Sequence, residues 1–88
     1  MPKLSQFFGI EISVRPRETS HSLPHFHARY GSEEVSVAIG TLEVLAGNMN
    51  ARALALVIEW AFQHRPELHV AWSDLKAGRK PNQIEPLK

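Results

Sequence analysis

The segment Leu23–Gly31, which reads LPHFHARYG, carries the residues best suited to chemistry. Pro24 favours an extended run after it, and polar and apolar side chains alternate over the next six residues. Strand side chains point alternately to two faces, so we expect His25, His27 and Arg29 to share one face. The two imidazoles would be attached about 7 Å apart. This spacing suits two ligands of one metal ion, or an acid and a base on either side of a reacting phosphate.

The catalytic alternative is a ribonuclease mechanism. RNA cleavage needs a base for the 2′-hydroxyl proton, an acid for the leaving oxygen and a cation for the developing phosphorane charge. Histidine suits the first two roles because its ordinary pKa lies near neutrality. We therefore name His25, His27 and Arg29 as candidate catalytic residues, with Arg15 as an alternative cation for the phosphate.

The second alternative is a metal site. Neutral imidazoles two residues apart on a strand can chelate zinc or nickel, but a third ligand is required. His21 in the adjoining loop is the best candidate, and His64 near the end of a predicted helix is another. The predicted ligand set is therefore His21, His25 and His27, and the cofactor would be a divalent metal such as zinc.

A third alternative is a binding module without chemistry, in which the histidines and the arginine make hydrogen bonds to a partner. The commoner role of a strand histidine is simpler still, since it bonds neighbouring backbone or a carboxylate such as Glu11. The same sequence offers no phosphate-binding glycine loop, dinucleotide fingerprint or serine or cysteine nucleophile.

The composition limits the class of protein. Its 88 residues make one small domain, with ten Lys and Arg against nine Asp and Glu, so no strong charge draws it to nucleic acid. The absence of cysteine excludes disulfides and thiolate metal sites. We find no signal peptide and no apolar run of about 20 residues, and therefore predict a cytoplasmic location without a membrane partner.

The elements that must position the histidines follow from periodicity. Alternation predicts strands, and a Gly31-Ser32 turn joins the second to the third. From Asn50, a helix N-cap, the apolar period becomes helical, and Pro66 starts a second helix. In this prediction strands occupy residues 7–15, 25–30, 34–39 and, as a short fourth, 42–45, and helices occupy about 50–64 and 66–78.

These elements predict an α+β fold in which three or four antiparallel strands are packed by two C-terminal helices. Residues 1–88 form one domain, and residues 79–88 are expected as an extended tail. The face opposite the helices carries ionisable groups, and nothing in the chain is expected to cover it, so water or a partner does. A core this thin would also gain from self-association. The residues predicted on that face are Glu11, Ser13, Arg15, His25, His27, Arg29, Glu34 and Ser36.

Four stretches of the sequence resemble the small bacterial proteins grouped as domain of unknown function 4160. MPKLSQFFGIEI is similar to the family opening MPxISRFFGIxI, and HSLPHFHARYG is similar to HxPPHFHAxYG, with Leu23 in place of a proline. ALALVIEWAFQHRPEL resembles a helix ending in EWxxxHxxEL, and GRKPNQIEPL resembles the tail GxxPxxIxPL. The motif positions among these residues are His21, His25, His27, Glu59, Trp60 and His64.

The resemblance implies a partner more firmly than a reaction. Members of this family have no settled activity, and they are often encoded beside another small protein, in the manner of a toxin–antitoxin pair. In this chain RPRETS replaces an aspartate- or tyrosine-containing segment that often precedes the histidine motif in the family. Glu18 is the one carboxylate that this segment keeps as a candidate ligand. We therefore expect a component of a toxin–antitoxin-like module that acts through the histidine-rich face, as a ribonuclease-type toxin in its catalytic form. Its expected partners are the neighbouring gene's protein, RNA and a second copy of itself.

Overall fold

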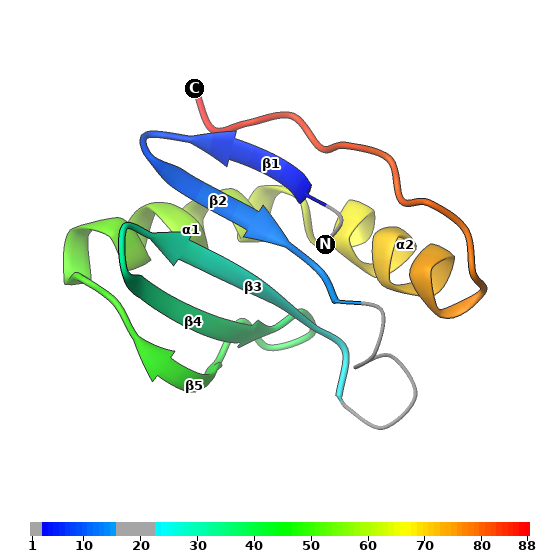
Figure 1. The fold of residues 1–88 in the computed structure, drawn as a ribbon, viewed down its shortest axis with the longest axis horizontal. Coiled ribbons are helices and arrows are strands. Elements are labelled where there is room, and N and C mark those ends of the chain that lie inside the picture. Colours follow the sequence, from blue (N-terminus) through cyan, green and yellow to red (C-terminus); the bar gives the residue numbers. More distant parts are fainter. Residues whose placement is uncertain (1–2, 16–22) are drawn as a thin grey trace.

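The computed structural model describes residues 3–15 and 23–88. Over these residues five strands form one antiparallel sheet in chain order, and two helices follow (Figure 1). The α+β fold predicted from the sequence is confirmed, with one strand more than the three or four expected. The elements are β1 (Lys3–Phe7), β2 (Ile10–Ser13), β3 (His25–Tyr30), β4 (Glu33–Ala38), β5 (Val44–Asn48), α1 (Ala51–Gln63) and α2 (Arg65–Lys76).

The additional strand is at the N-terminal edge. The strand predicted over residues 7–15 is confirmed as β2 for Ile10–Ser13, but its predicted start is wrong, because a turn at Phe8-Gly9 separates Phe7, which belongs to β1, from β2. Both turn residues have positive φ, 48° and 80°, which matches the twist of a two-residue hairpin. Ser5 and Gln6 interrupt the alternation of β1, so its strand signal is weak. The predicted fourth strand at 42–45 lies at Val44–Asn48.

One face of the sheet packs against both helices (Figure 1). Phe26 and Ala28 of β3 are fully buried there, and the Trp60 ring of α1 lies 6.0 Å from the ring of Phe26 and 5.5 Å from that of Phe7. Each fully buried apolar side chain of this kind contributes about 1.5–3 kcal/mol. This core fixes the backbone of β3 and therefore the place of its polar residues.

The helices begin as the sequence predicts. The Asn50 side chain accepts hydrogen bonds from the backbone N–H groups of Arg52 and Ala53 at 3.0 and 3.2 Å, and Pro66 lies in the first turn of α2. Phe62 fits the apolar period of this helix in the sequence, but it is 69% exposed. The buried residues of α1 do not include Phe62. The Arg65 guanidinium lies over the Phe62 ring.

The C-terminal residues run beside β1 without forming a helix or strand (Figure 1). The Ile84 N–H donates to the Leu4 carbonyl at 2.7 Å, and the Trp60 indole N–H donates to the Glu85 carbonyl at 2.8 Å. Ile84 is buried, so this segment completes the core at that edge. In the described part of the chain, neither helix is long and apolar enough to cross a membrane.

Candidate functional site

The polar residues of β3 lie on the face opposite the apolar core, although His25, the first residue of the strand, also contacts α2 through Trp72. His27 pairs with Ser13 of β2 on one side and with Ser36 of β4 on the other. Arg29 lies between Glu11 and Glu34 in the next row of the same face. The antiparallel register therefore gathers onto this face polar residues from three neighbouring strands, β2, β3 and β4.

The two histidines of β3 converge rather than point apart. Their ring centroids are 5.1 Å apart, and the rings meet edge to face at 74°. The expectation that this face is open to water is wrong at both positions, because His25 is 7% exposed and His27 is 6% exposed. Each ring covers part of the other, and the Trp72 ring of α2 lies 5.2 Å from that of His25.

A backbone carbonyl orients His25. Its Nδ1 lies 2.7 Å from the Leu23 carbonyl oxygen. Because a carbonyl only accepts hydrogen bonds, Nδ1 carries the proton, and the neutral ring then has its lone pair on Nε2. The neighbouring Pro24 carbonyl accepts from the Ile39 N–H at 3.0 Å, which ties the segment before β3 to the residue after β4.

A single carboxylate oxygen joins His27 to a cation. Oε2 of Glu34 accepts from Nη2 of Arg15 at 2.6 Å and lies 3.5 Å from Nδ1 of His27. The sequence placed Glu34 on this face but gave it no role, since register alone pairs it with Arg29. Only side-chain reach across the strands brings it to His27.

These four side chains line one pocket of about 320 Å³, with β4 and β5 forming its other wall. Gly47 of β5 is required in that wall. Its φ is +81°, and a Cβ atom there would lie 2.2 Å from the Glu34 carbonyl oxygen. Only glycine allows β5 to approach β4 this closely.

Arg29 does not line this pocket. Its guanidinium pairs with the Glu11 carboxylate at 2.9 Å, and its side chain is 56% exposed. The cation beside the histidines is Arg15, which the sequence offered as the alternative phosphate ligand.

The three-histidine metal set is not complete in the described residues, since His21 lies outside them. Within residues 3–15 and 23–88 no three His, Asp or Glu side chains are grouped so that they could hold a metal ion. His64, the other third ligand considered, lies at the junction of α1 and α2. Its Nδ1 is 2.6 Å from the Glu67 carboxylate, and its ring packs on Trp60. His25 and His27 therefore stand as a two-histidine pair.

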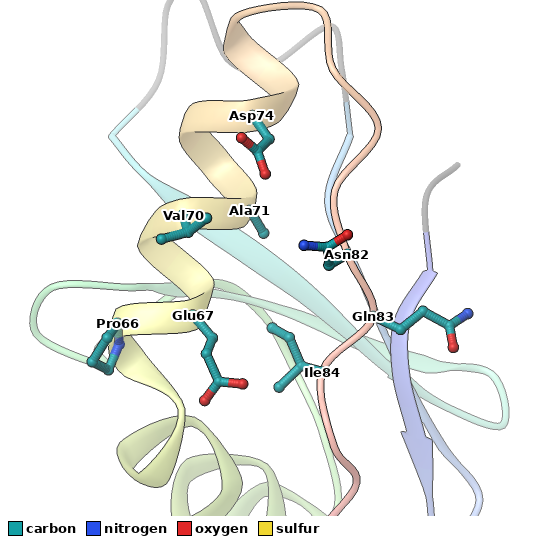
Figure 2. A pocket seen from close by; sticks show the side chains of 8 residues that line it. All are labelled: Pro66, Glu67, Val70, Ala71, Asp74, Asn82, Gln83 and Ile84. Atoms are coloured by element: carbon teal, nitrogen blue, oxygen red, sulfur yellow. The ribbon is translucent and has the colours of Figure 1, made fainter.

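A second hollow lies between α2 and the C-terminal segment (Figure 2). Its two carboxylates, Glu67 and Asp74, already contact cationic or proton-bearing side chains, namely His64 at 2.6 Å and Arg79 at 3.1 Å. Its lining residues include no histidine, so the pocket at β3 is the stronger candidate for chemistry. The lining residues are Pro66, Glu67, Val70, Ala71, Asp74, Asn82, Gln83 and Ile84.

Comparison with known proteins identifies one family. A family model described as domain of unknown function (DUF4160) matches residues 9–73. The match includes strands β2 to β5 but not β1. It also includes the four charged or histidine residues of the pocket, Arg15, His25, His27 and Glu34. No curated protein and no solved structure matches the chain.

Proposed function

The chain belongs to the DUF4160 family, and we propose that it is one component of a toxin–antitoxin-like two-protein module that cleaves RNA in the cytoplasm. The observation that supports this chemistry is the convergence of His25, His27 and Arg15 on one pocket, with the two rings 5.1 Å apart. The second protein of the module would be encoded by the neighbouring gene, as the family resemblance implies.

The two histidines differ in their neighbours, which supports a different proposed role for each. With its proton held on Nδ1 by the Leu23 carbonyl, neutral His25 has a lone pair on Nε2 and is the base. In the pocket without RNA, Nδ1 of His27 faces the Glu34 carboxylate 3.5 Å away, and a protonated His27 would be the acid when RNA binds.

In the proposed step, His25 takes the proton of the RNA 2′-hydroxyl as that oxygen bonds to the adjacent phosphorus. The bond from phosphorus to the 5′-oxygen breaks, and His27 gives its proton to that oxygen. The products are a 2′,3′-cyclic phosphate and a 5′-hydroxyl. Arg15 would stabilise the charge on the non-bridging oxygens during the step.

Metal binding is the second candidate, and the orientation of His25 favours it. Histidine ligands commonly donate their second ring N–H to a carbonyl or a carboxylate, and His25 makes such a bond to Leu23. The pair would need a third ligand, for which His21 stays a prediction. Zinc at 100 times its Kd would stabilise the fold by about 2.7 kcal/mol. Thermal unfolding of untagged protein with added zinc tests this, and no rise in Tm contradicts it.

Expression in a bacterial host tests the proposed function. We expect the chain alone to arrest growth and the neighbouring gene's protein to relieve the arrest. His25→Gln and His27→Gln should each abolish the arrest, whereas His69→Gln, on the exposed surface of α2, should leave it unchanged. Thermal unfolding of each purified variant separates lost chemistry from lost folding.

Two results would contradict the proposal. One is the absence of arrest when the wild-type chain is expressed. The other is undiminished arrest by a folded chain in which both His25 and His27 are glutamine.

A further inference from the structure

The Glu34 carboxylate occupies the position that an anionic ligand of the histidine pocket would need. Its Oε2 accepts from Arg15 at 2.6 Å and faces Nδ1 of His27 at 3.5 Å. A guanidinium and an imidazole around one oxygen are also the groups that proteins use to hold a phosphate oxygen. The chain thus supplies to its own pocket the charge that a phosphate would supply.

Glu34 can leave this position without disturbing the sheet. Its backbone is fixed in β4 between Arg29 and Asn48, but its side chain is 38% exposed. The Arg15 side chain is 29% exposed, and ion pairs this close to water contribute only about 0–1 kcal/mol. Rotation of the Glu34 side chain into solvent would therefore break its contact with the guanidinium at little cost.

We propose that the pocket is a phosphate site and that Glu34 is its internal competitor, which a bound phosphate group displaces from Arg15. The inference rests on the proposed function only for the source of the phosphate, which is then the RNA backbone. Glu34 would set a threshold, because a phosphate must bind more strongly than the carboxylate it replaces. Weakly held anions would then be excluded, and a phosphate anchored by the rest of an RNA chain would be admitted.

Titration of the purified full chain with inorganic phosphate tests the competition. Glu34→Gln removes the competing charge, and we expect phosphate to bind up to about fivefold more tightly, the factor that corresponds to an ion pair of about 1 kcal/mol. Glu33→Gln is the matched control, because it changes the net charge equally. The Glu33 carboxylate accepts from the Asn50 N–H at 2.9 Å and does not line the pocket. Its phosphate affinity should stay within about twofold of wild type.

Two further variants sharpen the result. Adding Arg15→Gln to Glu34→Gln should remove the gain, since the guanidinium that Glu34 releases is gone. Glu34→Ala should reproduce the gain, and it takes the place of Glu34→Gln if that variant does not fold. No tightening in any folded Glu34 variant would overturn the proposal, and so would equal tightening in Glu33→Gln.

A short single-stranded RNA provides the second arm. The same order of affinities with RNA indicates that the backbone is the source of the phosphate, whereas tightening for inorganic phosphate alone indicates a free-phosphate site. If folded Glu34 variants bind phosphate more tightly but the wild type never arrests growth, the toxin role fails and the competition stands. If arrest depends on both histidines but no variant tightens, only the competition fails.

Discussion

The two faces of β3 show how one strand serves two purposes. Phe26 and Ala28 point to the helices and are fully buried among apolar side chains. His25 and His27 point the other way and are almost as buried, but among rings and charged groups. The apolar face determines where the backbone lies, and the polar face uses that placement. In this protein, therefore, burial alone does not distinguish a residue of the apolar core from a residue of the candidate site.

The largest expected effect is on the apolar face. Phe26→Ala should lower the free energy of unfolding by about 3–5 kcal/mol, because it leaves a cavity beside Trp60. His27→Gln on the other face should cost only about 1 kcal/mol, since it loses polar contacts and little apolar burial. Urea denaturation of both variants measures the difference. Equal losses would show that the histidine face is part of the structural core.

A smaller effect is expected at the wall of the pocket. Gly47→Ala should cost about 3 kcal/mol, because its Cβ would meet the Glu34 carbonyl and its φ is positive. Gly31→Ala is the matched control, since its φ is also positive but no atom lies within 4 Å of the added Cβ. Its cost should be about 1 kcal/mol. Similar losses at the two glycines, measured by thermal unfolding, would mean that β5 does not depend on the close approach to β4.

Much of this contrast could be predicted from the sequence. Alternation between Pro24 and Gly31 predicts β3, and its period of two places both histidines on one face and Phe26 on the other. Both features depend on local pattern alone. The two helices can also be predicted from the sequence, since Asn50 and Pro66 mark where they start.

The remainder of the site depends on side-chain reach between strands, which a local pattern does not contain. The His25 ring contacts Trp72, which lies 47 positions along the chain and on another element. The role of Glu34 depends on its rotation toward Arg15 rather than toward Arg29, its partner in the register. The Phe8-Gly9 turn has no clear local signal in the sequence, because phenylalanine is an unusual residue at positive φ.

The smallest expected effect is at the exposed end of the polar face. Arg29→Ala should change the free energy of unfolding by less than about 1 kcal/mol, because the pair that it makes with Glu11 is exposed to water. It should also leave phosphate binding unchanged, whereas Arg15→Ala should abolish that binding. Urea denaturation measures the change in the free energy of unfolding, and phosphate titration measures the change in binding. A loss of phosphate binding in Arg29→Ala would show that the site extends along β3 to Arg29, as the sequence analysis predicts.

Cleavage of a labelled single-stranded RNA by the purified chain measures whether the two buried imidazoles of β3 act as one catalytic pair, as we propose. We expect fragments that end in a 2′,3′-cyclic phosphate, their loss in His25→Gln and in His27→Gln, and their retention in His69→Gln. Intact RNA with the wild-type chain, or unchanged fragments from folded variants that lack either imidazole, would contradict it.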